Sequence, residues 1–135
     1  MADVVGKKIL VTGGAGFIGS HLCDALLKKG AAKVVCVDNF FLGKMENLEN
    51  ALKHNHFVLY RDDAGNFGVL QSIMEKEKIE VVFNMATIAL NYSFFNPFDA
   101  YMVNVRIANT LLELLKIGLY RTLIHTSSSE AYGTA

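Results

Sequence analysis

Apolar residues gather in five short runs along the chain, and each run ends at or just before polar or glycine residues. These runs are Lys8–Thr12, Lys33–Val37, His56–Tyr60, Val81–Asn84 and Leu123–Thr126. Most of them are apolar at successive rather than alternate positions, which is the pattern of strands in a parallel sheet covered on both faces. We therefore predict that the five runs are the strands of a buried parallel sheet.

Longer stretches with helical spacing separate these strands. Helices are predicted at Phe17–Lys29, Lys44–Leu52, Phe67–Glu77 and Pro97–Lys116. In the last stretch, apolar residues form a broad stripe and Pro97 suits the first turn of a helix. Strict alternation with right-handed crossovers predicts an α/β fold in one domain over residues 1–135, a doubly wound parallel sheet between two helix layers (αβα) with strand order 3-2-1-4-5.

The turn after the first strand is rich in glycine. Gly13, Gly16 and Gly19 follow an apolar strand and lead into a predicted helix, which is the dinucleotide-binding fingerprint of a Rossmann sheet. Gly13 permits a sharp turn, Gly16 lets the backbone approach a pyrophosphate, and Gly19 lets the helix pack closely on the sheet. The helix N-terminus then offers N–H groups to the phosphates, so phosphate binding is favoured over a merely flexible loop.

An acidic residue ends the second strand at the distance that this fingerprint requires. Asp38 lies 19 positions after Gly19, where a carboxylate can meet the hydroxyls of an adenosine ribose. A carboxylate there would repel a 2′-phosphate, so NAD is the predicted cofactor rather than NADP. The alternative for Asp38 is a strand-end turn residue or a helix cap.

The amino-acid composition limits the kinds of protein and of binding partner that this chain can represent. The 135 residues are 52% hydrophobic and 19% charged with a formal net charge of zero, which indicates a globular domain and argues against a nucleic-acid partner. No apolar run is long enough to span a membrane and no secretory signal is visible, so a cytoplasmic location is expected. Cys23 and Cys36 lack metal-ligand spacing and are interpreted as buried reduced thiols, so no metal site is predicted.

A candidate site segment follows each of the five predicted strands. Because the carboxyl ends of parallel strands meet at one edge of a doubly wound sheet, these segments are predicted to form a single site. The segments are Gly13–Ile18, Asp38, Asp62 with Asp63, Met85–Ala89 and Ser127–Glu130.

Five of these motifs occur together in a known order. TGGAGFIGSHL, VDNFFLGK, the Asp62 strand end, FNMA and HTSSSEAYGTA resemble the extended short-chain dehydrogenase/reductase family, and within it the NAD-dependent nucleotide-sugar epimerases and dehydratases. The resemblance covers the whole chain but only the N-terminal part of such an enzyme. It implies transient hydride transfer to NAD, a keto-sugar intermediate and a nucleotide-activated sugar as substrate.

The resemblance also implies roles for individual residues at the cofactor site. Those implied to hold NAD are Phe17 and Ile18 at the pyrophosphate, Asp38, Asn39 and Gly43 at the adenosine ribose, Asp62 and Asp63 at the adenine, Met85, Ala86 and Thr87 under the cofactor, and Asn104 on the last helix. Two of these have plain structural alternatives, since Asp63 also reads as a solvated cap and Asn104 as a polar helix-packing residue.

Catalysis is implied at the end of the fifth strand. Ser128 occupies the family's catalytic Ser/Thr position, where a hydroxyl can bind the sugar oxygen, and Glu130 is a candidate for the proton transfer of a dehydratase. The alternatives are a turn serine and a surface glutamate. The aromatic cluster of Tyr92, Phe94 and Phe95 is interpreted as core rather than as a pocket lining.

The family's Tyr-x-x-x-Lys pair is missing, because no tyrosine in the 135 residues is followed by lysine four positions later. The resemblance places that pair and the sugar-binding part further along the chain. We therefore expect a truncated portion of an enzyme that is a homodimer at full length, and expect this portion alone to be inactive. The alternative is a stand-alone, non-catalytic dinucleotide-binding module.

Overall fold

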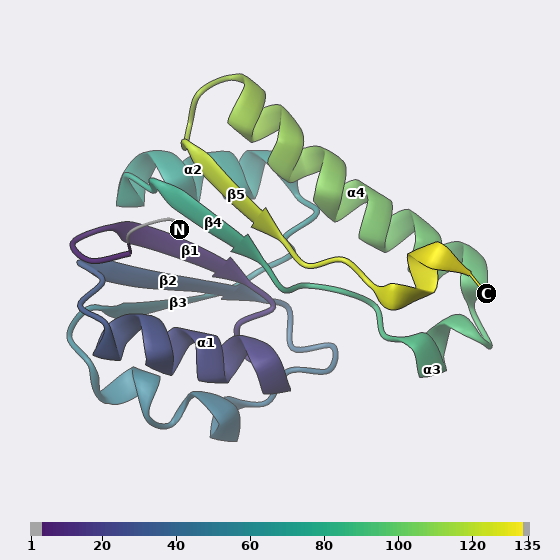
Figure 1. The fold of residues 1–135 in the computed structure, drawn as a ribbon, viewed down its shortest axis with the longest axis horizontal. Helices are drawn as coiled ribbons and strands as arrows, with labels where there is room; N and C mark the ends of the chain where they lie inside the picture. The colour runs from purple at the N-terminus through teal and green to yellow at the C-terminus, as the bar shows by residue number, and fades with distance from the viewer. Residues whose placement is uncertain (1–3, 134–135) are drawn as a thin grey trace.

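The computed structural model describes residues 4–133. Over these residues five parallel strands form one sheet in the order β3-β2-β1-β4-β5, as the sequence predicts. The strands are β1 (Lys8–Thr12), β2 (Lys33–Asp38), β3 (Phe57–Arg61), β4 (Val81–Asn84) and β5 (Thr122–His125). All arrows in Figure 1 point the same way, so their carboxyl ends share one edge of the sheet, called the carboxyl edge below.

Helices cover both faces of the sheet (Figure 1). The α-helices are α1 (Phe17–Lys28), α2 (Phe67–Glu77), the short α3 (Leu90–Ser93) and α4 (Pro97–Lys116). Helix α1 lies on one face, and α2 and α4 lie together on the other, which gives the predicted αβα layers. The described residues also include three 3-10 helices, η1 (Met45–Leu48), η2 (Ala51–Lys53) and η3 (Ser129–Tyr132).

The core has two halves because successive strand side chains point to opposite faces. Ile9 and Val11 of β1 pack into the cluster beneath α1, whereas Leu10 between them packs into the cluster beneath α2 and α4. All three are fully buried, so β1 is the centre of the sheet in packing as well as in order. This explains why the strand runs are continuously apolar rather than alternating.

Polar contacts tie the helices on the α2–α4 face to the strands. The carboxylate of Glu77 at the end of α2 accepts from Lys33 Nζ at 2.8 Å and from the Tyr60 hydroxyl at 2.6 Å. These two hydrogen bonds, Lys33 first, hold the pKa of Glu77 below its ordinary value. Tyr120 donates its hydroxyl to the carbonyl of Leu111 at 2.7 Å, and burial raises the pKa of Tyr120 to about 12.

Two expectations about local structure are wrong. The predicted helix Lys44–Leu52 is instead the pair of 3-10 helices η1 and η2, since the backbone N–H of Lys44 and the amide of Asn47 both donate to the carbonyl of Ala15. The predicted aromatic core is also wrong at Phe94 and Phe95, which are 71% and 85% exposed.

Candidate functional site at the carboxyl edge

The Gly-rich turn packs against the ends of the two strands that flank β1, namely β2 and β4. Gly13 has φ +68°, in the left-handed region, and a Cβ on it would lie 2.7 Å from the backbone N and Cα of Ala86. The N–H of Gly13 also donates to the carbonyl of Val37 at 2.8 Å. A Cβ on Gly19 would collide with the carbonyl oxygen of Gly13. The turn therefore has room only for glycine at positions 13 and 19, where the backbone packs against the segment after β4 and against the turn itself.

Helix α1 begins at this turn without a side-chain cap. Gly16 is its N-cap, has no side chain to accept a hydrogen bond, and no acidic residue follows in the first turn. Phe17 and Ile18, the first two helical residues, are exposed at the carboxyl edge. The positive end of the helix dipole is thus left for an anion, as the fingerprint predicts.

Asp38 joins the Gly-rich turn to the loop after β2. Its Oδ2 accepts from Ala15 N–H at 2.9 Å and its Oδ1 from Phe40 N–H at 2.8 Å, and the residue is only 7% exposed. Each carboxylate oxygen has a second lone pair, so these bonds leave acceptor capacity for two hydroxyl groups. A Cβ on Gly43 would lie 2.8 Å from Asp38 Oδ1, which accounts for glycine at that position.

The neighbouring positions of the predicted adenosine pocket make mostly local contacts. Asn39 Oδ1 accepts from the N–H of Phe41 at 3.0 Å, and Asp62 N–H donates to the carbonyl of Asp38 at 3.1 Å. The carboxylate of Asp62 accepts from the backbone of Asp63 at 3.0 Å. These contacts bring the ends of β2 and β3 together, beside Asp38.

Asp63 is committed to a different partner. Its Oδ2 forms an ion pair with Arg106 of α4 at 2.7 Å, and its Oδ1 accepts from Gly65 N–H at 2.7 Å. This pair ties the loop after β3 to α4 and gives Asp63 a structural role that the sequence alone does not reveal.

The segment after β4 passes beside the Gly-rich turn. Met85 N–H donates to the carbonyl of Thr12 at 3.1 Å, and Ala86 lies against Gly13. Asn104 of α4 holds the next part of this segment, accepting from Ile88 N–H at 2.8 Å and lying 3.3 Å from the hydroxyl of Thr87. Asn104 therefore fixes the path of the loop that lines the site.

A chain of polar side chains beneath the site, buried at Thr12 and Asn84 and exposed at His125, was not predicted. The hydroxyl of Thr12 donates to Asn84 Oδ1 at 2.6 Å, and Asn84 Nδ2 lies 3.0 Å from Nδ1 of His125. With the amide oriented in this way, His125 Nδ1 is the acceptor. The chain links the ends of β1, β4 and β5, and only the polar identity of residues 12 and 84 inside apolar strands could have signalled it.

The predicted catalytic residues follow β5. Ser128 lies at the carboxyl edge, and its carbonyl accepts from Ala131 N–H at 3.2 Å as η3 begins. Glu130 lies within η3, and its side chain is outside the part of the chain that the structure describes.

Both cysteines lie directly under the Gly-rich turn. Cys23 and Cys36 are free thiols and fully buried, as predicted. A Cβ on Gly14 would lie 2.5 Å from the Sγ of Cys36 and 3.3 Å from that of Cys23. A hydrogen bond to Cys23 and burial raise the pKa of Cys36 well above its ordinary value, so this thiol is a poor nucleophile at neutral pH.

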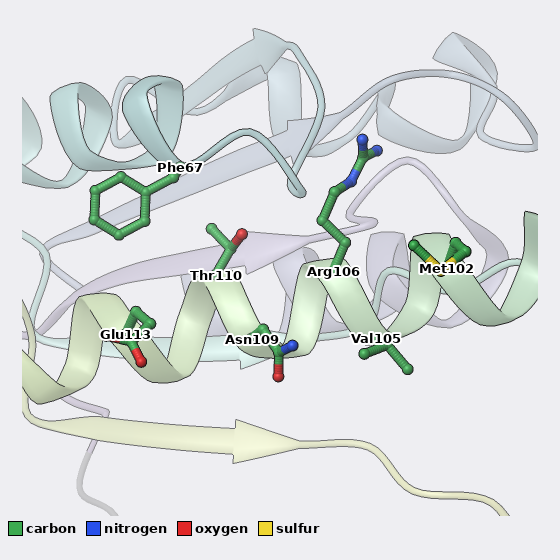
Figure 2. Close-up of a pocket in the computed structure, with 7 residues that line it drawn as sticks. All are labelled: Phe67, Met102, Val105, Arg106, Asn109, Thr110 and Glu113. Atoms are coloured by element: carbon green, nitrogen blue, oxygen red, sulfur yellow. The ribbon is translucent and has the colours of Figure 1, made fainter.

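A cavity of about 340 Å³ lies elsewhere, between α2 and α4 (Figure 2). It is lined by Phe67, Met102, Val105, Arg106, Asn109, Thr110 and Glu113. None of these is a predicted site residue, and the doubly wound sheet places its ligand at the carboxyl edge instead. Within residues 4–133, no helix is long and apolar enough to cross a bilayer.

The sheet order, the uncapped helix after a Gly-rich turn, and the strand-end carboxylate together define a dinucleotide-binding type of Rossmann domain. The chain belongs to the family described as GDP-mannose 4,6 dehydratase, whose profile matches residues 10–135. This confirms the expected membership of the extended short-chain dehydrogenase/reductases.

Similar proteins include several nucleotide-sugar enzymes. dTDP-D-glucose 4,6-dehydratase of Dictyostelium discoideum is 35% identical over 135 residues, covering 98% of this chain and 31% of the relative. UDP-glucuronic acid decarboxylase 1 of Arabidopsis thaliana is 37% identical, covering 96% and 28%. UDP-glucose-4-epimerase of Stenotrophomonas maltophila, solved with NAD and formylated UDP-arabinopyranose, superposes with a TM-score of 0.86 at 26% identity, covering 96% and 39%. The chain thus spans less than half of each relative.

Proposed function

We propose that this chain is the NAD-binding portion of a nucleotide-sugar epimerase or dehydratase. The observation that carries the proposal is the bonding of Asp38. Its carboxylate accepts a hydrogen bond from the Gly-rich turn and retains lone pairs for ribose hydroxyls. Its negative charge disfavours the additional phosphate of NADP. The NAD bound to the similar epimerase supports the same choice.

The remaining predicted residues extend the proposed cofactor site around Asp38. Phe17 and Ile18 flank the pyrophosphate at the start of α1, while Asn39, Gly43 and Asp62 line the adenosine end. Met85, Ala86 and Thr87 run beneath the cofactor, with Asn104 holding their loop in place. Asp63 supports this end through its ion pair with α4.

The chemistry follows from the position of Ser128. When bound, NAD supplies a reversible acceptor for a hydride from a sugar carbon. The hydroxyl of Ser128 would hydrogen-bond the oxygen on that carbon as the alcohol becomes a ketone and returns. Glu130 would move the proton that a dehydratase, unlike an epimerase, has to transfer at a neighbouring carbon.

The first test is a titration of the 135-residue chain with NADH and with NADPH, followed by nicotinamide fluorescence. We expect saturable NADH binding that is at least about tenfold tighter than NADPH binding. A tenfold difference in Kd corresponds to about 1.4 kcal/mol, and the repulsion between a buried carboxylate and the extra phosphate of NADPH should exceed that energy. Asp38→Ala should abolish the preference. Binding of neither nucleotide, or tighter binding of NADPH, would contradict the proposal.

A stand-alone dinucleotide-binding module is the second candidate. What supports it is that the Gly-rich turn, Asp38 and the segment after β4 hold one another in place through contacts within this chain. A longer protein of this family with Ser128→Ala should lose sugar turnover while it retains NADH binding. Absence of sugar turnover in the unaltered longer protein would favour the module, whereas unchanged turnover in the Ser128→Ala variant would remove Ser128 from the mechanism. We also propose a homodimer for the longer protein, which sedimentation equilibrium would test.

A further inference from the structure

The loop after β2 and the short helix α3, which follow strands on opposite sides of β1, are joined by an aromatic contact. The rings of Phe41, in the loop after β2, and Tyr92, in α3, lie edge to face with centroids 5.2 Å apart and an interplanar angle of 88°. In the sheet order, β1 lies between β2 and β4. A contact between the segments that follow those two strands therefore spans the end of β1, where the Gly-rich turn begins (Figure 1).

The Phe41 side of this contact is held by the site itself. Asp38 Oδ1 accepts from Phe40 N–H at 2.8 Å, and Asn39 Oδ1 accepts from Phe41 N–H at 3.0 Å. Phe40 has φ +60°, an uncommon conformation for an aromatic residue, and its ring lies 5.2 Å from the guanidinium of Arg61. Strained backbone of this kind gathers at functional sites, where it serves to aim a neighbouring group.

The Tyr92 side is held by α4. Its hydroxyl donates to Asp99 Oδ2 at 2.9 Å, and this hydrogen bond raises the pKa of Tyr92, so the phenol stays protonated as the donor. Although Phe41 contacts Tyr92, it remains 51% exposed. The contact thus leaves apolar ring surface free to cover a ligand.

We propose that Phe41 and Tyr92 form an aromatic clasp that closes over a dinucleotide lying on the Gly-rich turn and slows its release. The clasp rests on the proposed function, because it needs a ligand that crosses the switch point between β1 and β4. Both are positioning residues, since they retain the ligand rather than react with it. An edge-to-face aromatic pair has the strength to change a dissociation rate about 2- to 10-fold.

Stopped-flow release of NADH, chased with excess NAD, tests the clasp. Phe41→Ala and Tyr92→Ala should each release NADH about 2- to 10-fold faster, with little change in the association rate. Tyr92→Phe keeps the ring and should restore most of the slow release. The control is Phe98→Ala, which removes an aromatic ring that is 76% exposed on the neighbouring helix.

The double variant separates a clasp from two independent structural effects. Phe41→Ala combined with Tyr92→Ala should release NADH no faster than the quicker single variant, because one contact is lost in every case. Release rates unchanged by Tyr92→Ala, or raised equally by Phe98→Ala, would overturn the clasp while leaving NADH binding intact. Failure of the unaltered chain to bind NADH would overturn the proposed function, and the clasp with it.

Discussion

Replacing Asp38 with asparagine should destabilise the chain far more than a surface amide substitution does. The carboxylate accepts two backbone N–H groups, from Ala15 at 2.9 Å and Phe40 at 2.8 Å, in a site that is only 7% exposed. Asparagine retains one acceptor oxygen, so one N–H would face an NH₂ group, and the other bond would lose its charge. Hydrogen bonds to charged groups contribute about 1.5–3 kcal/mol each, which predicts a loss of about 2–4 kcal/mol.

Urea denaturation at neutral pH, followed by far-UV circular dichroism, measures this loss. A small domain has a total stability of about 5–15 kcal/mol, so the midpoint of Asp38→Asn should fall clearly with an unchanged slope. Asp62→Asn is the matched control, because Asp62 directly follows β3 and its carboxylate accepts a local N–H, that of Asp63. We expect the control to lose less than about 1 kcal/mol. Equal losses in the two variants would refute the bridging role of Asp38.

Three further predictions concern stability. Gly13→Ala should cost about 2–4 kcal/mol in urea denaturation, since its Cβ would lie 2.7 Å from the backbone of Ala86 and its φ is +68°; a loss under about 1 kcal/mol would contradict this. Glu77→Gln should cost about 2 kcal/mol at pH 7. The pairing with Lys33 lowers the pKa of Glu77. The greater stability of the wild type over Glu77→Gln is therefore present above the ordinary pKa of 4.5 and disappears as the pH falls towards the lowered pKa. A stability difference that persists in acid would refute the pairing. Tyr120→Phe should lower the stability measured by thermal unfolding by about 1 kcal/mol. This loss should be the same between pH 6 and about 9, because burial raises the pKa of Tyr120 to about 12. A loss that varies over that range would show that the phenol ionises.

Most of the sheet could be predicted because its strands are buried on both faces and read as continuous apolar runs. The predicted strand bounds differ from the observed ones by about one residue, as at β5, which is Thr122–His125 rather than Leu123–Thr126. The Gly-rich turn could also be predicted, because the positive φ of Gly13 favours glycine, while the ribose contact of Asp38 stays a prediction. The positive φ of Gly13 is a local constraint that the local sequence can signal, whereas its contact with Ala86 joins residues far apart in the chain.

The parts that escaped prediction depend on distant partners. The segment at η1 is drawn out of a regular helix by hydrogen bonds to Ala15, about thirty residues earlier in the chain. Asp63 pairs with Arg106, and Phe41 contacts Tyr92, although the partners are far apart in the sequence. The spacing of apolar residues along the chain cannot predict such contacts. The aromatic character of Phe94 and Phe95 predicts core positions, yet both residues, which follow the short α3, are exposed. Long-range pairing and the direction of a short helix are set by tertiary packing rather than by local pattern.

The packing of Gly14 against Cys36 has a consequence for how this domain can vary. A methyl group at position 14 would occupy the place of the Cys36 sulfur, since the built Cβ lies 2.5 Å from it. The two positions therefore share a fixed volume, although they lie 22 positions apart in the chain. Substitutions there should be inherited or engineered as matched pairs, with alanine at position 14 tolerated only when position 36 shrinks to glycine or alanine. The Gly-rich turn is thereby coupled to one core residue on the second strand, and replacing the turn with one that lacks glycine at position 14 should fail unless position 36 is changed with it.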